Sequence, residues 1–145
     1  SMVAVGVRKV EMEEVFEQSD IISIHAPELP STYHIVNEAS IASMKDGVIL
    51  INTARGTAID EQALAKALLS GKIKTACLDV YDPEPPCADN PLLKLDNCIM
   101  TPHIAGQAAN GLQRIGYNCY CQLLHFLAGE RMQGEITRDM LNHIA

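Results

Sequence analysis

The chain has 145 residues, of which 48% are hydrophobic and 20% charged, the balance of one ordinary globular domain. Its net charge of −7, with no cluster of lysines and arginines, argues against nucleic acid or an acidic membrane surface as a partner. No apolar run approaches the roughly 20 residues of a membrane span, and no signal peptide is evident. We therefore expect a cytoplasmic protein with a real hydrophobic core.

The first half of the chain alternates helical and strand patterns. Residues Glu11–Gln18 predict a short acidic helix, and the β-branched run Ile21–Ile24 predicts a strand. Asn37 can cap a helix that carries Ile41 on its apolar face. The apolar run Val48–Ile51, entered from an Asp-Gly turn, predicts the second strand.

The alternation continues into the second half. Asp60 can cap a helix that Gly71 ends, and Thr75–Val80 predicts the third strand. Four prolines predict a rigid, irregular loop over Tyr81–Pro91, and Cys98–Met100 predicts the fourth strand. Short continuous apolar runs are typical of strands buried on both faces of a parallel sheet.

Two further helices are predicted near the C-terminus. Apolar residues at a spacing of three to four predict a long helix over Leu112–Phe126, which Gly129 ends. A last short helix is expected over about Thr137–His143. Because strands alternate with helices along the chain, we predict an α/β fold with a doubly wound parallel sheet.

The cysteines do not point to disulfides or to a metal. There are five of them, so any full pairing leaves one over, and no C-x-x-C spacing occurs. Only Cys119 and Cys121 lie close in sequence, with no second pair at the spacing of zinc ligands. We expect reduced, mostly buried thiols and no metal site.

Ionisable residues follow the predicted strands, at the sheet edge where α/β proteins bind their ligands. They are Arg55, Asp79, Glu84 and His103, with His25 as a weaker candidate. Histidine exchanges protons near neutral pH, a neighbouring carboxylate orients it, and the arginine fork matches a carboxylate. The pattern favours chemistry on a small acid, but it does not by itself specify a hydride transfer.

Each of these residues also has a structural explanation. Arg55 fits a surface salt bridge, Glu84 a solvated loop, and His103 a hydrogen-bonded loop residue, so the evidence lies in their convergence on one edge. The phosphate-binding pattern G-x-G-x-x-G occurs nowhere in the chain.

Four segments, in order, resemble the D-isomer-specific 2-hydroxyacid dehydrogenases. They are Ser23–Thr32 (SIHAPELPST), Ile51–Leu64 (INTARGTAIDEQAL), Leu78–Leu93 (LDVYDPEP…NPLL) and Thr101–Gly106 (TPHIAG). The resemblance runs from about Gly6 to the C-terminus. It implies a Rossmann-like sheet and a parent enzyme that transfers a hydride between NAD(P)H and a small 2-oxo or 2-hydroxy acid.

The resemblance also implies roles for particular residues. Arg55 would bind the substrate carboxylate and polarise the carbonyl, His103 would act as acid and base, and Glu84 would support His103. Residues that match the family's contacts with NAD are Ala26, Pro27, Thr53, Ala54, Arg55, Asp79, His103, Ala105 and Gly106. A preference between NAD and NADP is not evident from these residues.

Much of the family's pattern does not appear in these residues. The first two strands of the cofactor domain, its glycine-rich loop and the separate substrate domain have no counterpart. We therefore expect residues 1–145 to form a truncated NAD-binding domain that is inactive alone and holds NAD weakly. Two alternatives stay open: a non-catalytic protein-binding module of the same fold, or a truncated product without function.

The expected truncation has a consequence for assembly. Without its usual neighbour, the strand over Ile21–His25 becomes a sheet edge with unpaired backbone groups, although its sequence is apolar. We expect the chain to form a homo-oligomer, such as a twofold dimer, through this edge or the bare apolar face beside it.

Overall fold

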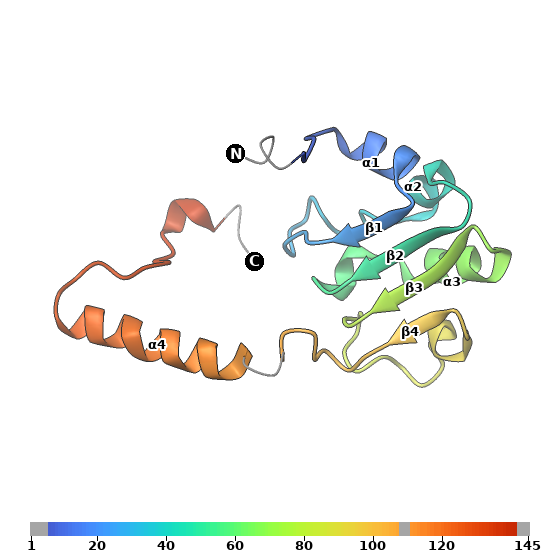
Figure 1. Cartoon of the computed structure of the whole chain (residues 1–145). Helices are drawn as coiled ribbons and strands as arrows, with labels where there is room; N and C mark the ends of the chain where they lie inside the picture. The colour runs from blue at the N-terminus through green and yellow to red at the C-terminus, as the bar shows by residue number, and fades with distance from the viewer. Residues whose placement is uncertain (1–5, 108–110, 142–145) are drawn as a thin grey trace. The chain divides into compact units, whose positions relative to one another are not determined.

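The computed structural model describes residues 6–107 and 111–141. The chain divides into two compact units, Ser1–Pro102 and His103–Ala145, and each is described by itself. We call the first the sheet unit, because all four strands belong to it, and the second the C-terminal unit (Figure 1).

The sheet unit alternates helices with short strands. Its elements are α1 (Met12–Gln18), β1 (Ile21–Ile24), α2 (Glu38–Ser43), β2 (Val48–Asn52), a 3-10 turn (Gly56–Ala58), α3 (Glu61–Ser70), β3 (Ile73–Leu78), a second 3-10 turn (Pro91–Lys94) and β4 (Cys98–Met100). All four predicted strands are confirmed, although β3 begins and ends two residues earlier than predicted. The segment between β3 and the second 3-10 turn is irregular, as its prolines indicate.

The four strands form one parallel sheet in the order β1-β2-β3-β4. The register pairs Ile22 with Leu50, Leu50 with Ala76, and Ala76 with Cys98. Each strand thus lies beside its successor in the chain, and β1 is an edge strand. The α/β, Rossmann-like fold class predicted from the sequence is confirmed.

Two predicted caps fix where helices begin. The Asn37 side chain accepts hydrogen bonds from the backbone of Ala39 and Ser40 at 2.9 and 3.1 Å. The Asp60 side chain accepts from Gln62 and Ala63 at 3.0 and 3.1 Å. These oxygens satisfy backbone N–H groups that have no partner within the helix.

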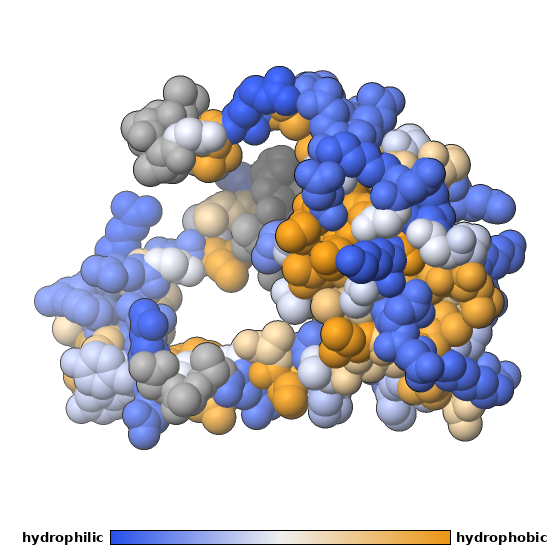
Figure 2. Space-filling model, turned by 45° about the vertical axis from the view of Figure 1, so that its right-hand side comes forward, coloured by the Kyte–Doolittle hydropathy of each residue, from blue (hydrophilic) through white to orange (hydrophobic). Residues whose placement is uncertain are grey.

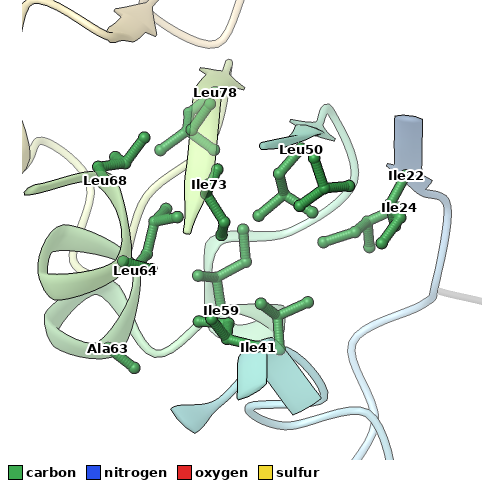
Figure 3. Close-up of a cluster of buried hydrophobic side chains, with 14 of the residues drawn as sticks. Ile22, Ile24, Ile41, Leu50, Ile59, Ala63, Leu64, Leu68, Ile73 and Leu78 are labelled. Carbon is green, nitrogen blue, oxygen red and sulfur yellow. The ribbon is translucent and has the colours of Figure 1, made fainter. Parts of the chain in front are cut away.

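One face of the sheet carries the hydrophobic core (Figure 3). Buried strand residues pack there against α1, α2 with its C-cap, and α3: Ile22, Ile24, Val48, Leu50, Ile73, Ala76 and Leu78 against Phe16, Ile41, Met44, Ala63, Leu64 and Leu68. Right-handed crossovers between neighbouring parallel strands place successive helices on the same side of a sheet. The sequential strand order therefore explains why α2 and α3 cover one face.

The expectation that the strands are buried on both faces is wrong for this structure. Ile21 of β1 is 59% exposed and Ile99 of β4 is 56% exposed, while Ile49, Ile51 and Cys77 are half-buried. These residues occupy the face opposite the core, which we call the open face. Apolar side chains also reach the surface in the space-filling view (Figure 2).

The C-terminal unit contains the amphipathic helix α4 (Gly111–Leu127). Gly129 has φ 72° and ends it, as predicted. The expected last helix is only a 3-10 turn, Arg138–Met140, within the described residues, because so short a segment gains too few hydrogen bonds to offset its nucleation cost. Residues 142 and 143 lie outside the described part of the chain. No helix among the described residues has the length and hydropathy to cross a bilayer.

Candidate active site

The carboxyl ends of the four parallel strands meet at one edge of the sheet unit. β1 leads to Ala26 and Pro27, β2 to Thr53 and Ala54, β3 to Asp79, and β4 to Thr101. Most sequence-predicted residues of the sheet unit therefore lie in loops that leave this edge, as expected for a ligand site in an open α/β sheet.

A buried asparagine shapes the turn that presents Arg55. The side-chain amide of Asn52 donates to the Arg55 carbonyl at 2.8 Å, and its oxygen accepts the Ala54 N–H at 3.0 Å. The Arg55 Nη1 atom donates to the Ala54 carbonyl at 2.7 Å, and Nε lies 3.8 Å from an oxygen of Glu28. Both charged side chains are about half-exposed, so this long ion pair adds little stability.

Gly56 brings the Arg55 turn against the chain that follows β3. A Cβ atom placed on Gly56 would lie 2.0 Å from the backbone carbon and oxygen of Tyr81. No side chain fits into that space. The turn that carries Arg55 and the segment that leads to Glu84 are therefore in direct backbone contact.

The loop that carries Glu84 is held from two sides. The Tyr81 N–H donates to the Glu84 Oε1 atom at 2.9 Å. Glu61, at the start of α3, accepts the Asp82 N–H at 3.1 Å and the buried Asn90 side-chain amide at 2.5 Å. The peptide bonds before Pro83 and Pro85 are cis. Glu84 is exposed, but the hydrogen bond from Tyr81 fixes the orientation of its carboxylate.

Asp79 is a buried carboxylate at the end of β3. It accepts a hydrogen bond from the Thr101 hydroxyl at 2.5 Å, and its own N–H donates to the Asn52 carbonyl at 3.0 Å. The single proton of the Tyr81 hydroxyl is shared between the carbonyls of Thr101 and Leu78, whose oxygens lie 2.6 and 2.9 Å away. Burial raises the pKa of Tyr81 above its usual value, which keeps the phenol protonated as a donor.

His103, Ala105 and Gly106 belong to the C-terminal unit. His103 has φ 53°, in the left-handed region, which an ordinary side chain adopts only at an energetic cost. The Gln107 N–H donates to the Ile104 carbonyl at 2.9 Å and closes the turn after His103. The predicted pairing of His103 with Glu84 stays a prediction.

His25, the weaker candidate, has a structural role in the loop after β1. Its Nε2 atom lies 2.8 Å from the Ser23 hydroxyl, within hydrogen-bond distance. Within residues 6–107 and 111–141, no group of three His, Cys, Asp or Glu side chains could hold a metal ion.

Sequence reasoning missed three residues that shape the site: Asn52, Glu61 and Tyr81. Each is polar or aromatic and stands within two residues of a predicted site residue or helix cap, but none has a distinctive spacing of its own. Glu61 and Tyr81 act through partners distant in sequence, which no local pattern indicates. Asn52 could have been suspected, because a polar residue ends an otherwise apolar strand.

Comparisons with known proteins identify the family of the chain. Residues 1–105 match the family described as "D-isomer specific 2-hydroxyacid dehydrogenase, NAD binding domain". Hydroxypyruvate reductase of Thermotoga maritima is 49% identical over 112 residues, which are 76% of this chain and 37% of that protein. The chain matches only about a fifth to two fifths of the length of such relatives, from 21% to 41%.

Solved structures show the same fold. The holo form of Rhodotorula graminis D-mandelate dehydrogenase superimposes with a TM-score of 0.83 at 33% identity, over 94% of this chain and 41% of that one. A D-isomer specific 2-hydroxyacid dehydrogenase from Xanthobacter autotrophicus Py2, solved with NADPH and MES, gives 0.77 at 32% identity, over 87% and 51%. The chain belongs to the D-isomer-specific 2-hydroxyacid dehydrogenase family, and its matching residues are those of the family's NAD-binding domain.

Proposed function

We propose that these residues supply the catalytic face of a dehydrogenase that interconverts a small 2-oxo acid and its D-2-hydroxy acid with NAD(H) or NADP(H). The observation that carries the proposal is the backbone contact between Gly56 and Tyr81. It brings the Arg55 turn and the Glu84 loop together at the edge where β2 and β3 end.

Each ionisable residue has a distinct role in this proposal. The Arg55 guanidinium binds the substrate carboxylate through its planar fork and polarises the neighbouring carbonyl. His103 donates a proton to the carbonyl oxygen during reduction and accepts it during oxidation. Glu84 accepts a hydrogen bond from the His103 ring and thereby fixes its orientation and tautomer.

The residues present fit one half of a nicotinamide dinucleotide. Ala26, Pro27, Thr53 and Ala54 offer small side chains at the strand ends, where a flat ring can approach the backbone. Asp79, held by Thr101, offers a carboxylate to an amide or a ribose hydroxyl. Four further residues are proposed to contact the cofactor: Arg55, His103, and the two small residues Ala105 and Gly106 in the turn after His103. The cofactor, when bound, supplies or takes up the hydride.

We propose that the 145 residues alone bind the cofactor weakly and do not turn over substrate. Their sequence contains no G-x-G-x-x-G loop for the pyrophosphate, and nothing in it matches the family's substrate domain. Reactants that are not held in register and shielded from water lose most of their rate enhancement.

A matched set of polypeptides tests the proposal. The 145 residues alone should reduce neither glyoxylate, pyruvate nor hydroxypyruvate with NADH. A chimera should be active in which the 145 residues replace the matching segment of the Thermotoga hydroxypyruvate reductase. In that chimera Arg55→Ala and His103→Ala should abolish turnover, while the exposed control Arg131→Ala should keep it. Full activity of the His103→Ala chimera would overturn the assigned roles.

We also propose that the chain forms a homo-oligomer. β1 is an edge strand with apolar Ile21 exposed, and a groove of about 420 Å³ lies beside it, lined by α1 and β1. Light scattering should show a dimer that Ile21→Lys weakens. Ile22 is unsuitable for this test because it lies in the core. A monomer at high concentration would contradict the proposal.

A further inference from the structure

Tyr81 contacts all three segments that lead to the proposed catalytic residues. Its backbone carbonyl packs on Gly56, next to Arg55. Its N–H donates to the Glu84 carboxylate at 2.9 Å. Its hydroxyl lies 2.6 Å from the carbonyl of Thr101, two residues before His103.

Tyr81 makes these three contacts through three different groups of its own: its carbonyl, its N–H and its hydroxyl. The side chain of Tyr81 is buried, so its hydroxyl cannot exchange the Thr101 carbonyl for water without an opening of the loop. The Thr101 N–H donates in turn to the Leu78 carbonyl at 2.9 Å. The end of β4 is therefore held from both sides, by the β3 backbone and by the Tyr81 phenol.

We infer that Tyr81 is a positioning residue, which fixes the end of β4 at Thr101, the part of the sheet unit that leads to His103, beside the loop that carries Glu84. The inference rests on the proposed pairing of Glu84 with His103. Tyr81 itself touches neither substrate nor cofactor in this scheme. A hydroxyl is needed, because a phenylalanine ring fills the same space but donates nothing to the Thr101 carbonyl.

The test is NMR on the 145-residue chain, uniformly labelled with ¹⁵N. Tyr81→Phe removes only the hydroxyl and keeps the N–H that Glu84 accepts. Tyr33→Phe, at an exposed tyrosine, is the matched control, and Glu84→Gln reports the proposed pairing. Two readouts are compared: hydrogen exchange of the Thr101 amide, and the ¹⁵N shifts of the His103 ring.

We expect Tyr81→Phe to speed exchange of the Thr101 amide about three- to tenfold, the factor that loss of one hydrogen bond gives. It should also shift the His103 ring signals in the direction that Glu84→Gln shifts them. Tyr33→Phe should change neither. If Tyr81→Phe leaves both readouts unchanged while Glu84→Gln moves the ring signals, the inference is overturned and the proposed function stands.

Two other outcomes are equally decisive. A uniform acceleration of exchange throughout β3 and β4, with unchanged ring signals, means a general loosening of the sheet and also overturns the inference. If Glu84→Gln leaves the ring signals unchanged but Tyr81→Phe still selectively exposes the Thr101 amide, the pairing in the proposed function fails. The positioning of the β4 end by Tyr81 then stands on its own.

Discussion

The two units of the chain are stabilised in different ways. In the sheet unit, Leu50, Leu64 and Ile73 are completely buried, and tertiary packing dominates. Helix α4 of the C-terminal unit has no buried residue, although its sequence is amphipathic. The side-chain hydrogen bonds made by its residues are local, such as the 2.6 Å contact between His125 and Glu130.

This difference shows that an amphipathic pattern predicts a helix but not its partner. The apolar face of α3 is buried within the sheet unit, because Leu64 and Leu68 lie in its core. In α4, by contrast, the apolar residues Leu123 and Phe126 are each more than half exposed. Single substitutions should therefore have effects that depend on the unit in which they lie.

The largest expected effect compares two leucines. Leu64→Ala, in the core, should lower the free energy of unfolding by about 2–5 kcal/mol, because it leaves a cavity. Leu123→Ala, on α4 and 54% exposed, should lower it by less than about 1 kcal/mol. Urea unfolding followed by circular dichroism measures both. Equal losses would mean that α4 is packed as tightly as α3.

The second comparison uses two glycines. Gly56→Ala should cost more than about 2 kcal/mol, because the new Cβ would overlap the Tyr81 backbone and the loop must shift. Gly129→Ala meets no atom within 4 Å, so only its left-handed backbone, φ 72°, opposes the change, at about 1 kcal/mol. The same unfolding assay ranks them, and the reverse order would contradict the close contact at Gly56.

A third comparison concerns thiols and pH. Burial raises the pKa of Cys98, on β4, to about 11, whereas Cys119 on α4 is exposed. A raised pKa favours the protonated thiol in the folded state. This contribution to stability is complete below the unfolded-state pKa, about 8.5, and is lost as the pH rises through about 11.

Alkylation at pH 9 measures the difference between these thiols. Cys119 should react with iodoacetamide well before Cys98, with Cys119→Ser and Cys98→Ser identifying the two sites. Stability should fall between pH 9 and 11 in the natural sequence and fall less steeply in Cys98→Ser. Rapid labelling of Cys98 in the folded protein would contradict its burial.

The smallest expected effect is in the C-terminal unit. Glu130→Gln removes the charge that faces His125. Both side chains are about half-exposed, so the change should cost less than about 1 kcal/mol and should vanish in high salt. Thermal unfolding at low and high salt checks this, with the exposed Glu135→Gln as the control. A larger loss that persists in salt would mean that this pair is buried in an assembly.

Local signals in the sequence predicted most of the fold. Asn37 and Asp60 cap helices through bonds to their own next few residues, and the apolar runs form the four strands. The open face could not be predicted, because an all-apolar run such as Val48–Ile51 does not state which of its faces a helix will cover. That depends on the strand order.

For the candidate site, sequence reasoning could predict only what topology alone decides. Parallel strands bring the Arg55 and Asp79 loops to one edge, and this follows from the alternation of elements. The contact of Gly56 with Tyr81 and the bond of Glu61 to Asn90 join residues far apart in sequence. Such contacts depend on atomic distances across the folded sheet, which spacing along the chain does not encode.

The sequential order of the strands also bears on how the sheet unit forms. Each strand pairs with the next one in the chain, so no pairing has to wait for a distant segment to arrive. Each parallel pairing still closes a helical crossover, which slows folding relative to a helical bundle, but the sequential order keeps every closure short for a parallel sheet. We expect the β2–β3 pair and the α3 crossover between them to form an early nucleus, and β1 and β4 to add to its two edges in either order.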